Sequence, residues 1–162
     1  MDLKSDQGFK QVFQEYYGLL FNISRKILND DNAAEDIVQD VFLKLWTNRF
    51  QTTIQTKLKS YLHRAVINAC LNELEKRKRV QIMERPPEQE DQAPNEEIPA
   101  EELTRRINQA ISTLPARMQV IFSLSRFEGL TNQEIADYLS ISKKTVENQM
   151  GKALSRLRDL LQ

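Results

Sequence analysis

The side chains whose types and spacing suggest chemistry gather first in a basic stretch near the C-terminal end of the sequence. Between Val146 and Leu157 the apolar residues recur at helical spacing, which predicts a helix with one buried side. Lysine and arginine can neutralise phosphates, and asparagine can pair with the edge of an adenine. The polar face therefore suits contact with DNA, although an ordinary solvated helix is the alternative. Its candidate residues are Lys143, Lys144, Thr145, Asn148, Gly151, Lys152 and Arg156.

A short helix and a tight turn precede this stretch and would position it. Thr131 and Glu134 lie three residues apart, which is the spacing of a capping box that opens a helix. Ser140 and Ile141 interrupt the helical pattern, and Ser142 can cap the next helix. Two helices joined by so short a turn form a helix-turn-helix. Glycine often occupies such a turn, so Ser140 predicts a slightly different turn geometry.

The second candidate site is an acidic face on a helix predicted to begin at Asn32. Asp36 and Asp40 lie four residues apart and are neighbours on that face, together with Gln39 and Leu43. Three interpretations stay open: a solvated surface, a docking ridge for a basic partner surface, or a carboxylate cluster that holds Mg²⁺ for phosphate chemistry. The magnesium interpretation needs a second, apposed set of carboxylates, and no other helical segment offers one.

The third candidate site lies on a long helix predicted from Leu58 to about Arg79. Its polar face combines an aromatic ring, amides and basic groups, which suits contact with bases and phosphates, although a solvated face looks similar. Ahead of this helix, residues 47–57 predict a polar loop that Phe50 and Ile54 partly anchor. The residues of the polar face are Tyr61, Arg64, Asn68, Asn72, Lys76 and Arg77.

A single histidine and a single cysteine limit the remaining chemistry. His63 has no second histidine or paired cysteine to complete a metal site, and Cys70 has no partner for a disulfide. Cys70 falls within a helical apolar pattern, so we expect it in the core. The sequence therefore predicts no catalytic residue, no metal site and no cofactor.

The helical patterns and the composition predict an all-α protein. Residues 1–79 carry a net charge of +3, residues 80–102 carry −7 and residues 103–162 carry +4. Residues 84–102 contain four prolines and almost nothing apolar, so they cannot bury a core. We therefore expect two small helical domains, at residues 1–83 and 103–162, joined by a flexible acidic linker at residues 84–102.

Membrane and export signals are not evident in the sequence. No apolar run approaches the roughly 18 residues of a membrane span. The first residues lack the apolar region of a signal peptide. We therefore expect a cytoplasmic protein with no membrane insertion.

Three blocks, in this order and spacing, resemble the bacterial extracytoplasmic-function (ECF) sigma factors, the smallest members of the main sigma family. Residues Ala34–Trp46 look like the helix that docks on RNA polymerase. Residues Tyr61–Asn72 are similar to the segment that opens the minus-ten promoter element. Residues Leu114–Phe122, with the helix-turn-helix, look like the domain that reads the minus-thirty-five element.

The resemblance implies a transcription initiation factor and not an enzyme. In this family the docking helix binds core RNA polymerase, which implies that role for Asp36, Gln39, Asp40 and Leu43. Promoter DNA is the second implied partner, bound by the polar face of the long helix and by the helix-turn-helix. Many relatives are held inactive by an anti-sigma factor, so such a protein is a third candidate partner.

Other interpretations stay open at this point. A dimeric activator or repressor of the response-regulator type has a very similar helix-turn-helix, but it would carry a receiver or ligand-binding domain upstream. Residues 1–79 show no alternation of strands and helices that would predict one. A magnesium-dependent enzyme that uses the acidic helix is the remaining alternative. Within the sigma interpretation, Glu147 stands where many relatives have arginine, so their promoter preference does not transfer.

Overall fold

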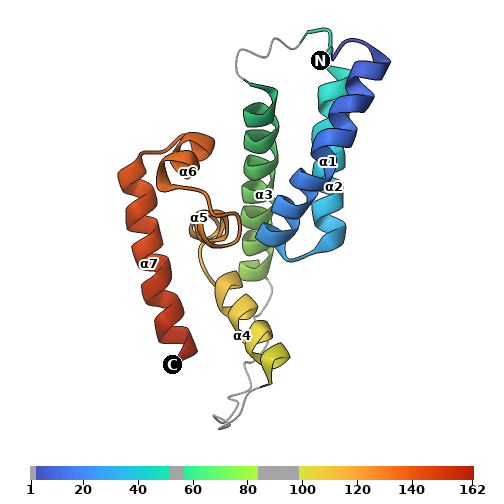
Figure 1. Cartoon of the computed structure of the whole chain (residues 1–162). Helices are drawn as coiled ribbons and strands as arrows, with labels where there is room; N and C mark the ends of the chain where they lie inside the picture. The colour runs from blue at the N-terminus through green and yellow to red at the C-terminus, as the bar shows by residue number, and fades with distance from the viewer. Residues whose placement is uncertain (1–2, 52–56, 84–98) are drawn as a thin grey trace.

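The computed structural model describes residues 3–51, 57–83 and 99–162, and these ranges form seven α-helices and no strand. The predicted all-α class is confirmed. Figure 1 shows α1, α2 and α3 together, with α5, α6 and α7 on the other side of α3. The helices are α1 (Asp6–Leu28), α2 (Asp31–Thr47), α3 (Leu58–Met83), α4 (Ala100–Ser112), α5 (Ala116–Arg126), α6 (Asn132–Leu139) and α7 (Lys143–Leu161).

The turn between α1 and α2 is set by two adjacent polar residues. Asn29 adopts the left-handed conformation with φ 51°, and its N–H donates to the carbonyl of Arg25 at 2.7 Å, which closes α1. Asp30 then caps α2, because its carboxylate accepts a hydrogen bond from the N–H of Ala33 at 3.1 Å. Helix α2 therefore begins one residue before the predicted Asn32.

The helix-turn-helix forms as its capping residues predict. The Thr131 hydroxyl accepts from the N–H of Glu134 at 3.1 Å, and the Glu134 carboxylate accepts from the N–H of Thr131 at 3.2 Å, which completes the capping box. Ser142 caps α7 by accepting from the N–H of Thr145 at 3.0 Å. Ser140 itself takes the left-handed conformation, with φ 56°, so it supplies the backbone geometry that glycine commonly provides.

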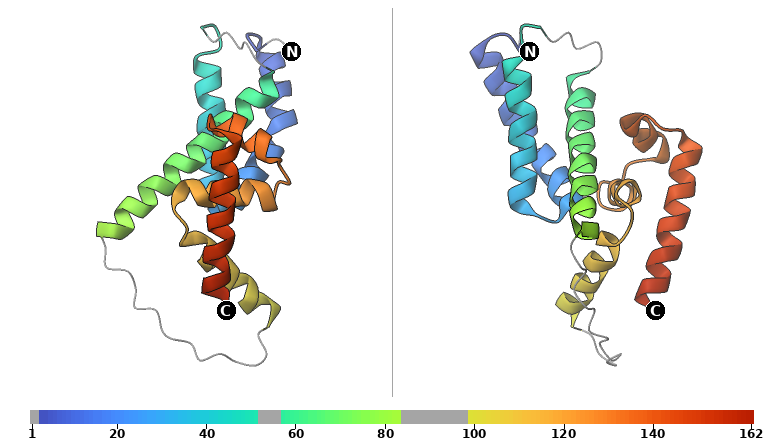
Figure 2. Two further views of the ribbon diagram at one scale, coloured as in Figure 1. Left: turned by 90° about the vertical axis from the view of Figure 1, so that its left-hand side faces the viewer. Right: turned by 180° about the vertical axis from the view of Figure 1, so that it is seen from behind.

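One hydrophobic core joins the N-terminal and C-terminal helices. Val12 and Leu20 of α1, Val66 of α3, Ile121 of α5 and Ile135 of α6 are all fully buried in the same cluster. Helix α3 contacts α1 and α2 on one side and α5 and α6 on the other (Figures 1 and 2). The sequence predicted two helical domains, but their packing against each other comes only from the structure.

Polar contacts also cross between the two groups of helices. The Lys26 ammonium of α1 lies 3.1 Å from the carboxylate of Glu128, which follows α5. The Lys78 ammonium of α3 donates to the carbonyl of Ser112 at 2.9 Å, at the end of α4. Burial lowers the pKa of Lys78. These contacts tie the C-terminal helices to α1 and to the C-terminal part of α3.

The predicted linker falls largely outside the described residues, because residues 84–98 are not among them. Its last three residues, 100–102, form the first turn of α4. There the Glu102 carboxylate accepts from Arg105 at 2.6 Å and from Arg106 at 3.3 Å. These two guanidinium groups, with Arg105 contributing more, lower the pKa of Glu102 to about 2. Helix α4 therefore begins inside the last part of the predicted linker.

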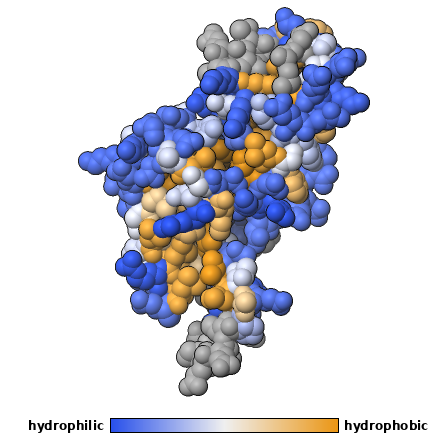
Figure 3. Space-filling model, viewed as in Figure 1, coloured by the Kyte–Doolittle hydropathy of each residue, from blue (hydrophilic) through white to orange (hydrophobic). Residues whose placement is uncertain are grey.

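A second, smaller hydrophobic cluster lies between α4, α5 and α7 and reaches the surface. Figure 3 shows an apolar area over the lower part of α7 and the neighbouring helices. At its edge Leu103, Leu154 and Leu160 are exposed. Across the described ranges, no helix has the length and apolar character needed to cross a membrane. The buried members of this cluster are Ala110, Ile111, Leu114, Met118, Phe122, Ala153 and Leu157.

Candidate nucleic-acid interface

The outer face of α7 presents the basic residues that the sequence predicted. Val146 and Ala153, on the opposite side of the helix, are fully buried. Figure 2 (left) shows α7 running along the surface of the molecule. A Cβ atom added at Gly151 would meet nothing within 4 Å, so packing within the chain does not require a glycine there. Thr145 is half-buried, and the exposed residues of the face are Lys143, Lys144, Asn148, Gly151, Lys152 and Arg156.

The N-terminal end of α7 is suited to a phosphate. Free N–H groups and the helix dipole favour an anion there, and Lys143 and Lys144 add two positive charges in the first turn. The Thr145 hydroxyl lies 2.7 Å from the Ser142 hydroxyl, so it belongs to the helix cap. Lys143, Lys144 and the helix end are therefore better placed than Thr145 to meet a DNA backbone.

Helix α6 packs against the buried side of α7 and fixes the direction of that helix. Ile135 and Ala136 are buried at 0% and 2% exposure, and both helices pack closely around them. The N–H of Ile141 donates to the carbonyl of Ala136 at 3.0 Å across the turn. A small side chain at Ala136 allows this close crossing. The basic face of α7 consequently points away from the core.

The acidic face of α2 is exposed along its length. Asp36, Gln39 and Asp40 are all exposed, and Gln39 donates to the carboxylate of Glu35 at 3.1 Å. Leu43 continues the same face and is 61% exposed, which leaves a large apolar side chain in water beside two carboxylates. Among the residues that the structure describes, no group of three or more His, Cys, Asp and Glu side chains could hold a metal ion.

The polar face of α3 is partly exposed and partly covered by α6. Tyr61, Asn72 and Lys76 are exposed. Arg64 is exposed too, but its guanidinium donates to the carbonyl of Asp137 at 2.9 Å. Asn68 is half-buried, and its amide donates to the carbonyl of Tyr138 at 3.3 Å. Two residues of the predicted face are therefore engaged by α6.

Arg77, another candidate on α3, is half-buried. Its guanidinium forms ion pairs with Asp30 at 3.0 Å and with Glu73 at 3.1 Å. The first pair ties α3 to the start of α2, where the N–H of Ala33 and the Arg77 charge lower the pKa of Asp30. This geometry gives Arg77 a structural role in addition to any contact with DNA.

His63 and Cys70 are both buried, and each has a nearby polar atom. Burial lowers the pKa of His63, whose Nδ1 lies 2.7 Å from the carbonyl of Lys59. Its ring also stacks on Tyr138 of α6, with centroids 5.9 Å apart. Burial raises the pKa of the Cys70 thiol to about 11, and its sulfur lies 3.3 Å from the Ser24 hydroxyl. The expectation that Cys70 is a core residue is confirmed.

A cation–aromatic stack at the end of α2 was not found by sequence reasoning. The Arg49 guanidinium lies 3.6 Å from the ring centre of Trp46 and 4.3 Å from that of Phe50. Phe50, predicted to anchor its loop, is instead 63% exposed, because it stacks on Arg49 at the surface. The spacing Trp-x-x-Arg-Phe was the available signal. Ile54, the other predicted anchor, lies outside the described residues.

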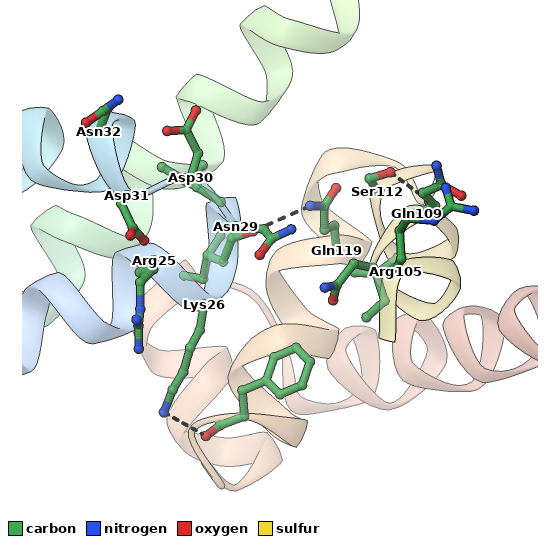
Figure 4. A pocket seen from close by; sticks show the side chains of 15 residues that line it. Arg25, Lys26, Asn29, Asp30, Asp31, Asn32, Arg105, Gln109, Ser112 and Gln119 are labelled. Carbon is green, nitrogen blue, oxygen red and sulfur yellow. Dashed lines mark hydrogen bonds between the residues drawn. The ribbon is translucent and has the colours of Figure 1, made fainter. Parts of the chain in front are cut away.

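An open groove of about 800 Å³ separates the α1–α2 turn from α4. Figure 4 shows its polar lining, with the Gln119 amide directed toward the α1–α2 turn. Gln119 donates to the carbonyl of Ile27 at 3.5 Å, and Lys26 donates to the carbonyl of Phe127 at 3.4 Å. The groove therefore lies where the two groups of helices meet. The hydrogen bonds of Gln119 and Lys26 connect the two groups there.

Two family models match the chain in the order that the fold suggests. The sigma-70 region 2 model matches residues 12–80, and the sigma-70 region 4 model matches residues 104–157. Together they cover about three quarters of the chain. The gap between the matches contains the predicted acidic linker.

Relatives and a solved structure agree with these matches. The ECF RNA polymerase sigma factor SigE of Mycolicibacterium smegmatis is 24% identical over 99% of this chain, which spans 65% of that relative's length. The ECF sigma factor SigM of Mycobacterium tuberculosis is 25% identical, over 95% of this chain and 77% of the relative.

The sigma factor RpoE of Bartonella quintana, solved in complex with the anti-sigma factor NepR, shares the fold. Its TM-score is 0.64 at 20% identity, and the match covers 96% of this chain and 97% of that chain. The region 2 and region 4 matches, in this order, are not those of a receiver domain joined to a helix-turn-helix. The chain therefore belongs to the extracytoplasmic-function sigma factors of the sigma-70 family.

Proposed function

We propose that this chain binds core RNA polymerase and directs it to promoters whose two elements are contacted by α3 and α7. The observation that carries the proposal is the pairing, in one chain, of an exposed acidic and apolar ridge on α2 with a capped, basic helix-turn-helix. Family membership supports both halves of this assignment. The chain acts as a binding protein in this proposal, with no catalytic residue and no cofactor.

The α2 ridge is the proposed docking site for core polymerase. Asp36, Gln39 and Asp40 offer acceptors to a basic surface, and Leu43 offers an apolar contact that is unsatisfied in the free chain. Burying a leucine side chain on binding contributes about 1.5–3 kcal/mol, whereas exposed ion pairs contribute about 0–1 kcal/mol each. Leu43 is therefore the expected centre of the interface, and the carboxylates orient it.

The α3 face is proposed to hold the minus-ten element. Tyr61 can stack on an unpaired base, and Arg64, Asn68 and Asn72 can donate to bases or phosphates. Lys76 extends the face toward the DNA backbone, with Arg77 beside it. Residues 47–57 stay a further candidate for single-strand contact, although residues 52–56 lie outside the described ranges.

The α7 face is proposed to read the minus-thirty-five element. Lys143 and Lys144, at the helix N-terminus, would position the helix on phosphates. Asn148, one turn further along, would reach base edges, and Gly151 would let a groove wall come close. Lys152 suits a guanine or a phosphate, and Arg156 a phosphate. Glu147 is exposed beside them and can accept from a cytosine amine.

The remaining proposals follow from the family. The chain would act in the cytoplasm, where its polymerase partner works. An anti-sigma factor is a candidate third partner, because the sigma factor RpoE of Bartonella quintana was solved in complex with the anti-sigma factor NepR. The surface that would bind it here stays a prediction.

Transcription in vitro tests the proposed function directly. Purified chain is added to purified core polymerase and a fragmented genomic library from the source organism, and the transcript starts are mapped. We expect transcripts that share two upstream elements and that disappear when the chain is omitted. Transcription starts that do not depend on the chain would contradict the proposal.

The docking ridge has its own matched test. Asp36→Arg combined with Asp40→Arg should abolish co-purification with core polymerase while the chain stays folded, because both positions are exposed. Glu35→Arg on the neighbouring exposed position is the control for added charge, and it should retain most of the binding. Equal co-purification of the double variant and the wild type would remove the ridge from the proposal.

A further inference from the structure

The basic outer face of α7 carries a single carboxylate among its cations. Glu147 is exposed at the start of the second helical turn, and it is the only acidic residue between Lys143 and Arg158. A carboxylate opposes binding to a polyanion, because DNA phosphates repel it. On a helix that met only phosphates, Glu147 would therefore weaken the binding that the surrounding cations provide. The cations are Lys143, Lys144, Lys152, Arg156 and Arg158.

The Glu147 carboxylate has no partner within the part of the chain that the structure describes. Elsewhere a helical carboxylate does pair with a nearby cation, since Glu73 lies 3.1 Å from the Arg77 guanidinium four residues further along. For Glu147 that position is Gly151, which has no side chain to offer. No ion pair joins Glu147 to a lysine of its own helix either. Its oxygens are therefore available to a group outside the chain.

The place of Glu147 along α7 suits the edge of a base better than the DNA backbone. The recognition helix of a helix-turn-helix puts the residues near its N-terminus on base edges in the major groove. Val146 is 0% exposed and points into the core, so Glu147 and Asn148, which follow it, are turned outward. Successive side chains of a helix diverge by about 100°. Glu147 and Asn148 should therefore meet two different, neighbouring base pairs.

The chemistry of the base edges decides which base a carboxylate can read. An ionised carboxylate only accepts hydrogen bonds. In the major groove, guanine presents two acceptors, and thymine presents an acceptor and a methyl group, so neither offers it a donor. Cytosine presents only its N4 amine, which is a donor, whereas adenine places an acceptor, N7, beside its N6 amine. Cytosine is thus the base that best matches Glu147.

We infer that Glu147 is a specificity-determining residue that selects a cytosine in the minus-thirty-five element, beside the base pair that Asn148 reads. The inference rests on the proposed function. At a site with guanine or thymine in place of the cytosine, the carboxylate faces acceptors and repels them, so wrong sequences are disfavoured as well as unrewarded. The lysines of α7 supply affinity that all sequences share, and Glu147 withholds part of it from sequences that lack the cytosine.

A promoter library tests this selection in the complete holoenzyme. The full chain is combined with core polymerase and transcribes a promoter in which every base of the upstream element is randomised. We expect wild-type holoenzyme to favour cytosine over guanine and thymine at one position by about 5-fold to 150-fold. Glu147→Ala should abolish that preference and leave the preferences at the other positions unchanged. A preference for any other base at the position that Glu147→Ala affects would overturn the inference.

A substitution that keeps the shape of the side chain separates base reading from a simple effect of charge. Glu147→Gln supplies an amide that both accepts and donates, which suits adenine, so the preference should move from cytosine to adenine. Removing a merely solvated charge would instead strengthen all promoters alike, and that outcome would contradict the inference. Asp159→Asn is the control, because it removes the other carboxylate of α7 and should shift no base preference. Circular dichroism verifies that each variant stays folded, as expected for exposed positions.

A change of one atom group in the DNA tests the contact itself. N4-methylcytosine at the selected position replaces the groove-facing N–H of the amine by a methyl group. Wild-type holoenzyme should bind this promoter about 5-fold or more weakly than the unmodified one, whereas Glu147→Ala should lose less than about 2-fold. Asn148→Ala keeps Glu147 and should show the full loss. Equal losses for wild type and Glu147→Ala would mean that the amine is not read by Glu147.

The proposed function and the selection by Glu147 fail in different ways. If the chain gives no promoter-specific transcription, the proposed function is overturned and the selection with it. If the wild-type holoenzyme transcribes from specific promoters, yet the Glu147 variants have the wild-type base preference at every upstream position, only the inference about Glu147 is overturned.

Discussion

The outer face of α7 and the polar face of α3 have similar chemistry but differ in the contacts they make within the chain. Both combine asparagine with lysine or arginine along one side of a helix. On α7, Asn148 and Lys152 are exposed to solvent. On α3, Arg64 and Asn68 donate to main-chain carbonyls of α6.

The difference shows that a binding pattern and a free binding surface are separate properties. The α7 face points outward because Val146 and Ala153 are buried beneath it. The α3 face has the same kind of buried stripe, but α3 lies between two groups of helices and is contacted from both sides (Figure 1). Which face is free therefore depends on neighbours that the helix itself does not encode.

The largest expected effect comes from a substitution in the core that the two groups of helices share. Ile121→Ala removes a fully buried side chain from the cluster that joins both helical groups, and it should lower the free energy of unfolding by about 2–5 kcal/mol. Because the core is shared, the loss should appear in one cooperative transition for the whole chain in urea. Leu160→Ala, at a position that is 54% exposed, should change the free energy by less than about 0.5 kcal/mol. Two separate transitions in the wild type would show that the domains are not coupled.

The free α7 face should respond with sequence-specific effects. Asn148→Ala should relax the preference at one base pair of the upstream element, at a cost of about 1–3 kcal/mol. Lys144→Ala is the control, because it should weaken all sequences alike and lower the salt slope by about one unit. A randomised promoter library transcribed by each mutant holoenzyme measures both. If Lys144→Ala changes the preferred base and Asn148→Ala does not, the two roles are reversed.

On the covered α3 face, two asparagines should behave differently. Asn72 is exposed and free of α6, so Asn72→Ala should impair open-complex formation by about 0.5–1.5 kcal/mol. Asn68→Ala removes a similar DNA contact, but it also removes a hydrogen bond that holds α6 in place. The defect of Asn68→Ala in open-complex formation should therefore be smaller than that of Asn72→Ala. Permanganate footprints of the melted region measure this, and a larger defect for Asn68→Ala would show that its bond to Tyr138 does not offset the lost DNA contact.

The smallest expected effect is a pH dependence of the packing between α3 and α6, where His63 stacks on Tyr138. Burial lowers the pKa of His63 below its ordinary value of 6.5, with the Lys59 charge acting in the same direction and the Lys59 carbonyl and Glu128 opposing it. When α6 separates from α3, His63 regains a more ordinary imidazole and binds a proton more readily. The packing of α6 on α3 should therefore weaken as the pH falls below about 6.5 and stay constant above it.

Energy transfer between dyes measures this dependence. Cysteines introduced at the exposed Thr47 and Leu160 accept the dyes, since the native Cys70 is buried and unreactive. His63→Phe keeps a ring against Tyr138 and should remove the dependence between pH 5 and pH 8, the range in which histidine commonly titrates. An identical pH profile in His63→Phe would assign the effect to another group.

Much of the fold and of the α7 site could be predicted because the responsible interactions are local. The capping box of Thr131 and Glu134 and the cap at Ser142 join residues three apart, so the sequence itself shows both partners. The apolar spacing between Val146 and Leu157 predicted the buried side of α7, and the apolar pattern around Cys70 predicted its burial. The acidic face of α2 was also predicted as exposed, since Leu43 and Asp40 fall off that helix's apolar stripe.

Only the tertiary structure decided that the two helical groups share a core and that α6 covers part of α3. The contacts of Arg64 with Asp137 and of Asn68 with Tyr138 join residues about seventy positions apart, and their acceptors are main-chain carbonyls that every residue possesses. No side-chain pattern marks such an acceptor. The sequence by itself therefore determined which helices form and which sides they bury, whereas long-range packing decided which polar faces stay free.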